Sequence, residues 1–173
     1  MQRSPRLSRP ALAAAVVGAA AAAGLTATSM TSASSESGAT KVKKQIICRA
    51  AMVSVVTPGT TAENYGTVSC TGRGFGTGVQ HDTAQLTRPS ETSAALSGRF
   101  RIFLDTGTLR GTYKATVTVA DEVATYKGTM KVSSGTGTLK GTTGTGTIAG
   151  TSRDAAHSTL TERLALTVPV PKE

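Results

Sequence analysis

The chain has 173 residues, with 19 Lys and Arg against 10 Asp and Glu, and a formal net charge of +9. This length suggests a single domain. Three Tyr, three Phe and no Trp argue against a nucleic-acid-binding module, which needs stacking aromatics beside its basic patch.

Residues 1–33 have the composition of a secretory signal peptide. The first nine residues hold three arginines and no acid, and an alanine-rich apolar run follows from Ala11 to Leu25. The run is shorter than the ~20 residues that a membrane-spanning helix needs, so we expect a cleaved signal and no stable membrane span. The preferred cleavage position is after Ala33, with Ala27 as the alternative. Cleavage after Ala33 leaves 16 basic and 10 acidic residues, a net charge of +6.

The mature chain is expected to begin with a flexible linker over 34–44, which is small and polar and ends in a basic cluster, Lys41–Lys44. The β-barrel domain is then predicted over 45–170. Both cysteines, Cys48 and Cys70, lie in this mature part. An even number of cysteines in a secreted chain indicates a disulfide, so we predict a Cys48–Cys70 bond and an extracellular location.

Apolar and polar residues alternate from Gln45 onward, as in strands with one buried face. After the signal no segment has a sustained helical period, and Thr and Val disfavour helix. The predicted strands cover 45–56, 65–70, 79–87, 97–105, 109–119, 124–132, 139–151 and 158–168. About eight short strands separated by turn signals predict an all-β fold, an antiparallel eight-stranded β-barrel. Small inward residues such as Gly111 and Ala115 fit either a lumen with a cavity or a tightly wound barrel with glycine at its bends.

Glycine recurs in two informative patterns. Gly72, Gly74, Gly76 and Gly78 occupy alternate positions, which predicts a strand face without side chains that allows a bend or a close approach of backbone or ligand. In addition, the segment Thr106–Thr112 (TGTLRGT) recurs as Thr136–Thr142 (TGTLKGT). We interpret the two copies as equivalent beginnings of two strands.

The segment after Gly107 carries a resemblance to a known family. Tyr126-Lys127-Gly128, then Ser134–Gly141 (SGTGTLKG) and Gly144, resemble the Y-x-G and G-G-T-G-x-(Y/F)-x-G-A-x-G motifs of allene oxide cyclase and dirigent-type barrels. Ser134 replaces the first glycine and Leu139 the aromatic residue. The resemblance covers roughly the last third of the mature chain. It implies an antiparallel eight-stranded barrel, often a homo-oligomer, with a hydrophobic lumen. Characterised relatives cyclise an epoxide or steer the coupling of phenoxy radicals. The earlier strands do not match, so no catalytic residue is carried over.

The candidate catalytic residue is Glu162, because it shares a strand face with Leu160, Leu164 and Leu166. A carboxyl among apolar groups has a raised pKa and can act as an acid or base. The alternatives are a position at the barrel rim or an ion pair with a cation such as Arg101. His81 and Asp82 are neighbours and face opposite sides of a strand, so they form no dyad.

The candidate ligand-binding residues are Tyr113, Tyr126, Met130 and Phe103, although the alternation places Phe103 on the face of Arg99 and Arg101. For Tyr113 and Tyr126, core filling is the alternative interpretation. The two histidines, His81 and His157, form no ligand-like cluster, so we expect no metal and no cofactor.

Three functions fit these observations. The leading hypothesis is a secreted β-barrel that binds a small apolar ligand or partner without catalysis. The second is an isomerase or cyclase that uses an inward acid such as Glu162 with a tyrosine. The third is a structural cell-envelope protein whose outer face is the working surface. No stable interaction with nucleic acid is expected.

Overall fold

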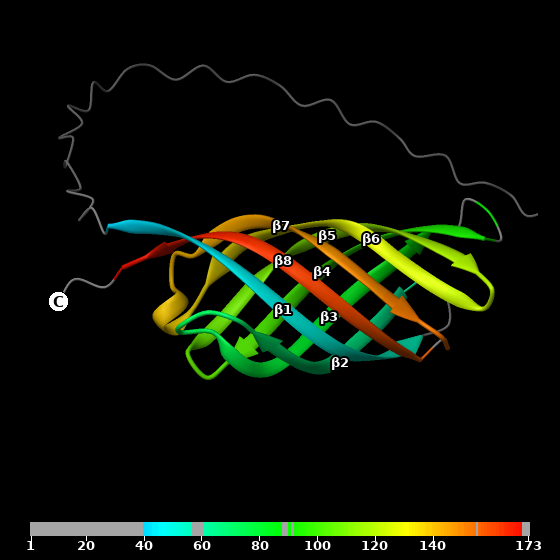
Figure 1. Ribbon diagram of the computed structural model, residues 1–173, viewed down its shortest axis with the longest axis horizontal. Coiled ribbons are helices and arrows are strands. Elements are labelled where there is room, and N and C mark those ends of the chain that lie inside the picture. The colour runs from blue at the N-terminus through cyan, green and yellow to red at the C-terminus, as the bar shows by residue number, and fades with distance from the viewer. Residues whose placement is uncertain (1–39, 57–60, 88–89, 91, 155, 171–173) are drawn as a thin grey trace, which may run out of the picture. The chain divides into compact units, whose positions relative to one another are not determined.

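The computed structural model describes residues 40–56, 61–87, 90, 92–154 and 156–170. The expected signal peptide and the start of the expected linker lie outside these residues. Eight strands form one closed barrel, as predicted (Figure 1). The strands are β1 (Lys41–Val56), β2 (Thr61–Cys70), β3 (Gly76–Thr87), β4 (Ser93–Leu104), β5 (Gly107–Ala120), β6 (Val123–Gly135), β7 (Thr143–Ser152) and β8 (His157–Pro169), with a 3₁₀ turn, η1 (Gly137–Leu139), between β6 and β7.

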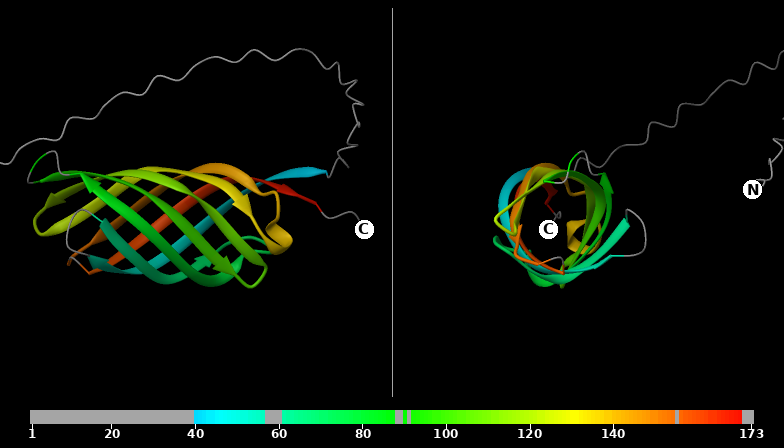
Figure 2. Two further views of the ribbon diagram at one scale, coloured as in Figure 1. Left: turned by 180° about the vertical axis from the view of Figure 1, so that it is seen from behind. Right: turned by 90° about the vertical axis from the view of Figure 1, so that its right-hand side faces the viewer.

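Each strand pairs antiparallel with the next, and β1 closes the barrel by pairing with β8 (Figure 2). The β1–β8 register runs from Lys41 opposite Pro169 to Val53 opposite His157, and the Val170 N–H donates to the Thr40 carbonyl at 2.7 Å. The chain therefore enters and leaves the barrel at the same end. β1 begins earlier than the expected Gln45, so the basic residues from Lys41 are part of the sheet.

The interior follows the alternation expected from the sequence. On β8, for example, Leu160, Glu162, Leu164, Leu166 and Val168 are all buried. On β7 the inward positions beside these leucines are glycines, and an ideal Cβ at Gly146 would lie 2.6 Å from a methyl carbon of Leu164. The small β7 residues thus leave room for the leucines of β8.

One end of the barrel is closed by packed side chains. Leu139 of η1 and Phe75 of the β2–β3 turn are each 3% exposed and belong to the same core as Ile46, Leu109 and Leu166. The turn around Phe75 uses three of the alternating glycines, because Gly72, Gly74 and Gly76 have φ of 98°, 89° and 72°. The expected bare strand face over all four glycines is therefore not formed, whereas the expected bend is: Gly72 and Gly74 shape a turn, and Gly76 and Gly78 belong to β3.

The two copies of the repeat are not equivalent in the structure. The first copy leads directly into β5, whereas the second forms η1 before β7 begins. The copies instead bind each other: the N–H groups of Thr136 and Thr138 donate to the carbonyls of Thr108 and Thr106, each at 2.9 Å. Their interaction holds η1 over the packed end.

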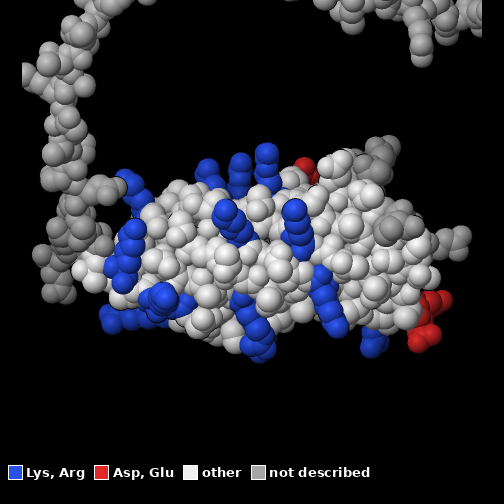
Figure 3. Space-filling view, turned by 90° about the horizontal axis from the view of Figure 1, so that it is seen from above, with Lys and Arg blue, Asp and Glu red and all other residues white. Residues whose placement is uncertain are grey.

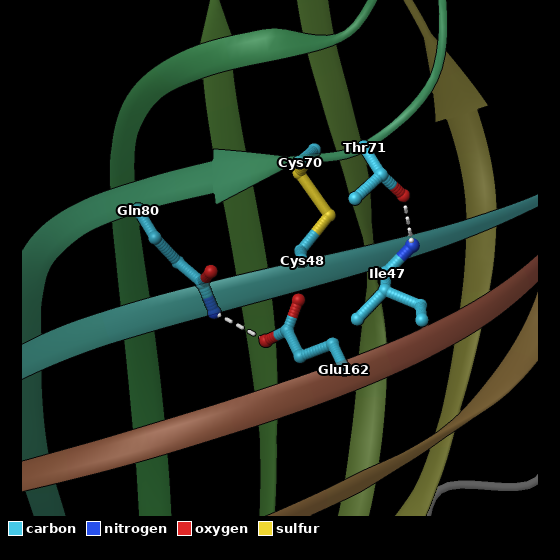
Figure 4. Close-up of a disulfide and its surroundings, with 6 residues drawn as sticks. All are labelled: Ile47, Cys48, Cys70, Thr71, Gln80 and Glu162. Atoms are coloured by element: carbon cyan, nitrogen blue, oxygen red, sulfur yellow. Dashed lines mark hydrogen bonds between the residues drawn. A yellow bond between two sulfur atoms is a disulfide. The ribbon is translucent and has the colours of Figure 1, made fainter.

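The predicted disulfide is present. Cys48 and Cys70 lie directly opposite each other on β1 and β2 and are bonded through their sulfurs at 2.02 Å. Both are buried in the lumen, and the pairing of the two strands continues beyond them through a 2.9 Å hydrogen bond from the Ile47 N–H to the Thr71 hydroxyl (Figure 4).

Candidate functional site

The half of the barrel away from η1 is hollow. It contains a cavity of about 430 Å³ whose apolar walls include Ala84, Leu96, Val117, Ile148 and Leu160. The lining reaches the barrel end formed by the β1–β2, β3–β4, β5–β6 and β7–β8 connections, since residues beside each of them contribute. The two interpretations of the lumen therefore each hold for one half: the η1 end is packed and the opposite end is open.

Asp82 of β3 and Tyr113 of β5 lie on the wall of this cavity at its inner end. They are 3% and 6% exposed. Gly98 of β4 sits opposite Tyr113 in the sheet, and an ideal Cβ there would lie 2.9 Å from ring atoms Cε1 and Cζ. The absence of a side chain at Gly98 thus lets the phenol ring lie flat against β4.

A buried polar cluster lies next to the inner end of the cavity and consists of Gln80, Asp82 and Glu162. The amide Nε2 of Gln80 donates to Glu162 Oε1 at 2.7 Å and approaches both carboxyl oxygens of Asp82 at 3.3 Å. Figure 4 shows the Gln80–Glu162 bond next to the disulfide. Gln80 is 1% exposed and Glu162 is fully buried, so this cluster joins β3 to β8 across the lumen.

Burial changes the acidity of both carboxyl groups. Desolvation, together with the nearby Glu162 charge, raises the pKa of Asp82 to about 8, against a smaller lowering by the Gln80 hydrogen bond. Desolvation also raises the pKa of Glu162 to about 7, again opposed by Gln80. The pKa of the Tyr113 hydroxyl is raised by desolvation and by the two carboxylates. Near neutral pH the cluster therefore holds at least one proton.

The cluster has no positively charged partner among the described residues. All described Arg side chains are exposed, and Arg101, considered above as a partner for Glu162, lies on the outer face opposite Arg110. The expected alternatives of a rim position or an ion pair for Glu162 were therefore wrong. Among the described residues, Glu162 Oε2 and Gln80 Oε1 are buried without a hydrogen-bond partner.

Two further carboxyl groups line the cavity at its open end. Glu122 lies in the two-residue β5–β6 turn, where Asp121 and Glu122 have φ of 50° and 63°, as in a type I′ hairpin turn. Asp154 accepts hydrogen bonds from the backbone N–H groups of Ala156 and His157 at 2.8 and 2.6 Å. These backbone bonds lower the pKa of Asp154, so it is anionic at neutral pH.

The sequence-predicted site residues are only partly brought together. Tyr113 and Tyr126 line the cavity. Glu162 points inward but lies behind the cavity lining. Met130 is buried outside the lining, and Phe103 lies on the outer face of β4 with 38% of its surface exposed, so it does not reach the lumen.

Sequence reasoning missed Gln80 and Asp82. Their strand carries the apolar Val79 on its outer face, where it is 54% exposed, so hydrophobicity alone does not tell which face of β3 is buried. The signal that the sequence does offer is the alternation along the strand, which puts Gln80, Asp82 and Ala84 on one face. His81 does face outward, where its ring stacks on Tyr65 with centroids 4.6 Å apart and contacts Glu63 at 2.5 Å.

The outer surface of the barrel is positively charged, opposite in sign to the acids of the lumen. On β4–β6 its cations are Arg99, Arg101, Arg110, Lys114, Lys127 and Lys131, and no acid shares their outward strand positions. On the face shown in Figure 3, Lys and Arg spread along the barrel and few acids are in view. The molecule is therefore basic outside and acidic inside.

No family model matches the chain, and no curated protein matches it. Within the described ranges, no helix is long and apolar enough to cross a membrane. The same residues contain no group of three or more His, Cys, Asp or Glu that could hold a metal ion.

Proposed function

We propose that this protein binds a small apolar ligand in the lumen of its barrel and performs no chemistry on it. The observation that carries the proposal is the cavity of about 430 Å³, walled mainly by apolar side chains and open at one barrel end. Its volume lies within the range of roughly 300–1,000 Å³ that is usual for small-molecule sites. Among the described residues, the packed opposite end leaves the cavity end as the route for the ligand in and out.

The inner end of the cavity supplies one polar anchor. Asp82 lines it, and the contacts that the Gln80 amide makes with its two carboxyl oxygens are long, at 3.3 Å each. A buried polar atom without a good partner costs about 1–3 kcal/mol, so a ligand that brings a hydrogen-bonding group to Asp82 gains affinity. The ligand is thus apolar along its length with one polar end.

Two further observations support the setting of this function. The buried Cys48–Cys70 disulfide is typical of proteins that fold in oxidising compartments, which supports secretion. The closed antiparallel eight-stranded barrel is the architecture implied by the resemblance to allene oxide cyclase and dirigent-type barrels, and it supports membership of that group as part of the proposal.

Native mass spectrometry of secreted protein tests the proposal, because it reports co-purified ligand and stoichiometry together. A matched pair of variants locates the site: Ala84→Leu adds a side chain on the cavity wall, and Ala149→Leu adds the same side chain on the exposed face of β7. We expect Ala84→Leu alone to abolish binding of a neutral dye such as Nile red. Equal binding by both variants would contradict a lumen site.

A second candidate function is that of an isomerase or cyclase, favoured by the buried carboxyl pair. Asp82, with its pKa raised to about 8, would act as a general acid toward a ligand in the cavity, with Tyr113 beside it. Incubation of wild type and Asp82→Asn with epoxide and phenolic substrates separates the two candidates. Turnover that is lost in Asp82→Asn would replace the binding function with a catalytic one.

A further inference from the structure

We propose that the ligand of the lumen is an apolar cation, a hydrocarbon body that carries one protonated amine. This inference rests on the proposed binding function and specifies the chemical class of the ligand. It is carried by the charges that face the cavity. Three acids line the cavity, Asp82 at its inner end and Glu122 and Asp154 at its mouth, and no Lys, Arg or His is among the described lining residues.

The surroundings of Asp82 offer it no compensating charge. β8 brings Glu162, and β3 itself brings only the neutral Gln80. β5 and β6 bring the hydroxyls of Tyr113 and Tyr126, and the charges of both carboxylates and of Tyr126 act on Tyr113. On β1 and β2 the nearby cysteines are oxidised to the disulfide and do not titrate. Every titratable group facing the cluster within the described residues is therefore acidic.

An ammonium group satisfies this environment better than the alternatives. It carries up to three N–H donors, which match the carboxyl oxygens of Asp82, the member of the cluster that lines the cavity, when that carboxyl is ionised. A neutral alcohol brings one donor, and when the carboxyl is ionised it leaves that charge unpaired in an apolar site, which is costly. A carboxylate or phosphate ligand would add a further negative charge to two buried acids.

The mouth and the outer surface favour the same ligand. Asp154 accepts hydrogen bonds at the cavity end from two backbone N–H groups and also contacts the His157 imidazole at 3.1 Å, and Glu122 lies in the adjacent hairpin turn. The outer wall of β4–β6 is positively charged. A cleft of one sign of charge in a protein of the other sign attracts counter-ions into the cleft and raises their association rate. A cation is therefore repelled by the walls and drawn to the opening.

Three probes with the same eight-carbon chain test the inference: octylamine, octanol and octanoate. Isothermal titration calorimetry gives their affinities for the full secreted protein, in two buffers that differ in ionisation enthalpy so that released protons are counted. We expect octylamine to bind at least about tenfold more tightly than octanol, the difference that one charge-assisted hydrogen bond makes. We also expect proton release at neutral pH and tighter amine binding at pH about 9 than at pH about 6, because the carboxyl groups ionise over that range.

Asp82→Asn should remove the proton release and the preference for octylamine, so that octylamine and octanol bind with similar affinity. Lys114→Gln, on the exposed face of β5, is the control and should change neither. Octanol or octanoate binding as tightly as octylamine would overturn the cation inference and leave the lumen-binding function standing. Absence of binding by all three probes, with a neutral dye also excluded, would overturn the proposed function itself. Far-ultraviolet circular dichroism of each variant excludes misfolding as the reason for a loss.

Discussion

Gln80 on β3 reaches across the lumen and donates a 2.7 Å hydrogen bond to Glu162 on β8, which is 82 positions away in the chain. A neutral amide thus stands where a buried carboxylate usually has a cation. Because the amide satisfies one oxygen without neutralising the charge, the cluster of Gln80, Asp82 and Glu162 remains sensitive to pH and to any charged group that enters the cavity.

The pH dependence of stability follows from this cluster. The pKa values of Asp82 and Glu162 are raised to about 8 and about 7 in the folded protein, above their values of 3.8 and 4.5 when unperturbed. The folded state then binds more protons than the unfolded state between pH about 4 and about 8, so stability falls as pH rises through this window. We expect the thermal unfolding midpoint to be higher at pH about 5 than at pH about 9.

The double variant Asp82→Asn/Glu162→Gln should flatten this dependence and exceed wild type in stability at pH about 9. Gln85→Ala, on the outer face of the same strand, serves as the control and should keep the wild-type slope. If the unfolding midpoint of the double variant still fell with pH as in wild type, the groups responsible would be other than Asp82 and Glu162.

Gly98→Ala tests the packing that positions Tyr113. The new methyl group would overlap the Tyr113 ring and the Thr83 carbonyl oxygen, so the ring must move toward the lumen. Overpacking of this kind costs about 1–3 kcal/mol, and we expect a comparable loss in urea unfolding together with weaker dye binding. Ser97→Ala, next along β4 and exposed, should have neither effect.

Glu122→Gly separates the stability of the β5–β6 turn from the charge at the mouth. A non-glycine residue in the left-handed region costs about 1–2 kcal/mol, and Glu122 has a φ of 63°. Glycine should therefore raise the free energy of unfolding by about 1 kcal/mol while slowing octylamine association in stopped-flow measurements. A variant that is more stable and associates at the wild-type rate would show that Glu122 does not attract the ligand.

Removing the disulfide should destabilise the barrel but should not abolish dye binding in the lumen. The bond joins residues 22 positions apart, and closing a loop of this size contributes about 3 kcal/mol in the chain-entropy model. We expect Cys48→Ala/Cys70→Ala to lose about that much in urea unfolding at low temperature, where it remains folded and binds the dye. A loss well below 1 kcal/mol would indicate a compact unfolded state.

Arg110→Glu tests the uncompensated charge of the outer wall. Arg101 and Arg110 are directly opposite each other on β4 and β5, and like charges in such pairs are destabilising by a few tenths of a kcal/mol. The substitution should raise stability by up to about 1 kcal/mol at low salt, with the gain disappearing at high salt. Thr118→Glu, exposed on β5 and opposite Ser93 and Thr125 rather than a cation, is the comparison and should not stabilise.

The fold was predictable because alternation of side chains is a local property. The period of two from Gln45 onward, with turns such as Asp121-Glu122, indicated the eight strands and the inward position of Glu162. The disulfide followed from the number of cysteines. The prediction was wrong for a segment whose shape depends on contacts distant in sequence. The second copy of the repeat forms η1, rather than the start of a strand, because it hydrogen-bonds the first copy.

The site was harder to predict because its residues come from different strands. Asp82 and Glu162 are brought together only by closure of the barrel through β1, and no spacing in the sequence encodes their approach. Val79 on the outer face and Gln80 and Asp82 on the inner face also invert the usual hydrophobic pattern of a strand. A polar inner face of this kind marks a site where function and packing make different demands on the same strand.

Because the start of β1 and the end of β8 meet at the packed end, a tether attached to either lies away from the cavity. Lys41 and Pro169 are opposite each other there, while the cavity opens beyond Ser54 and Ser158, toward the other end of the same two strands. A barrel tethered to a bead or a sensor chip by a linker following Val170 would present its opening to the solution. Ligand capture can therefore be measured on immobilised protein, and a peptide joining Val170 to Thr40 would allow new termini to be placed at the other turns of the packed end without obstructing the cavity.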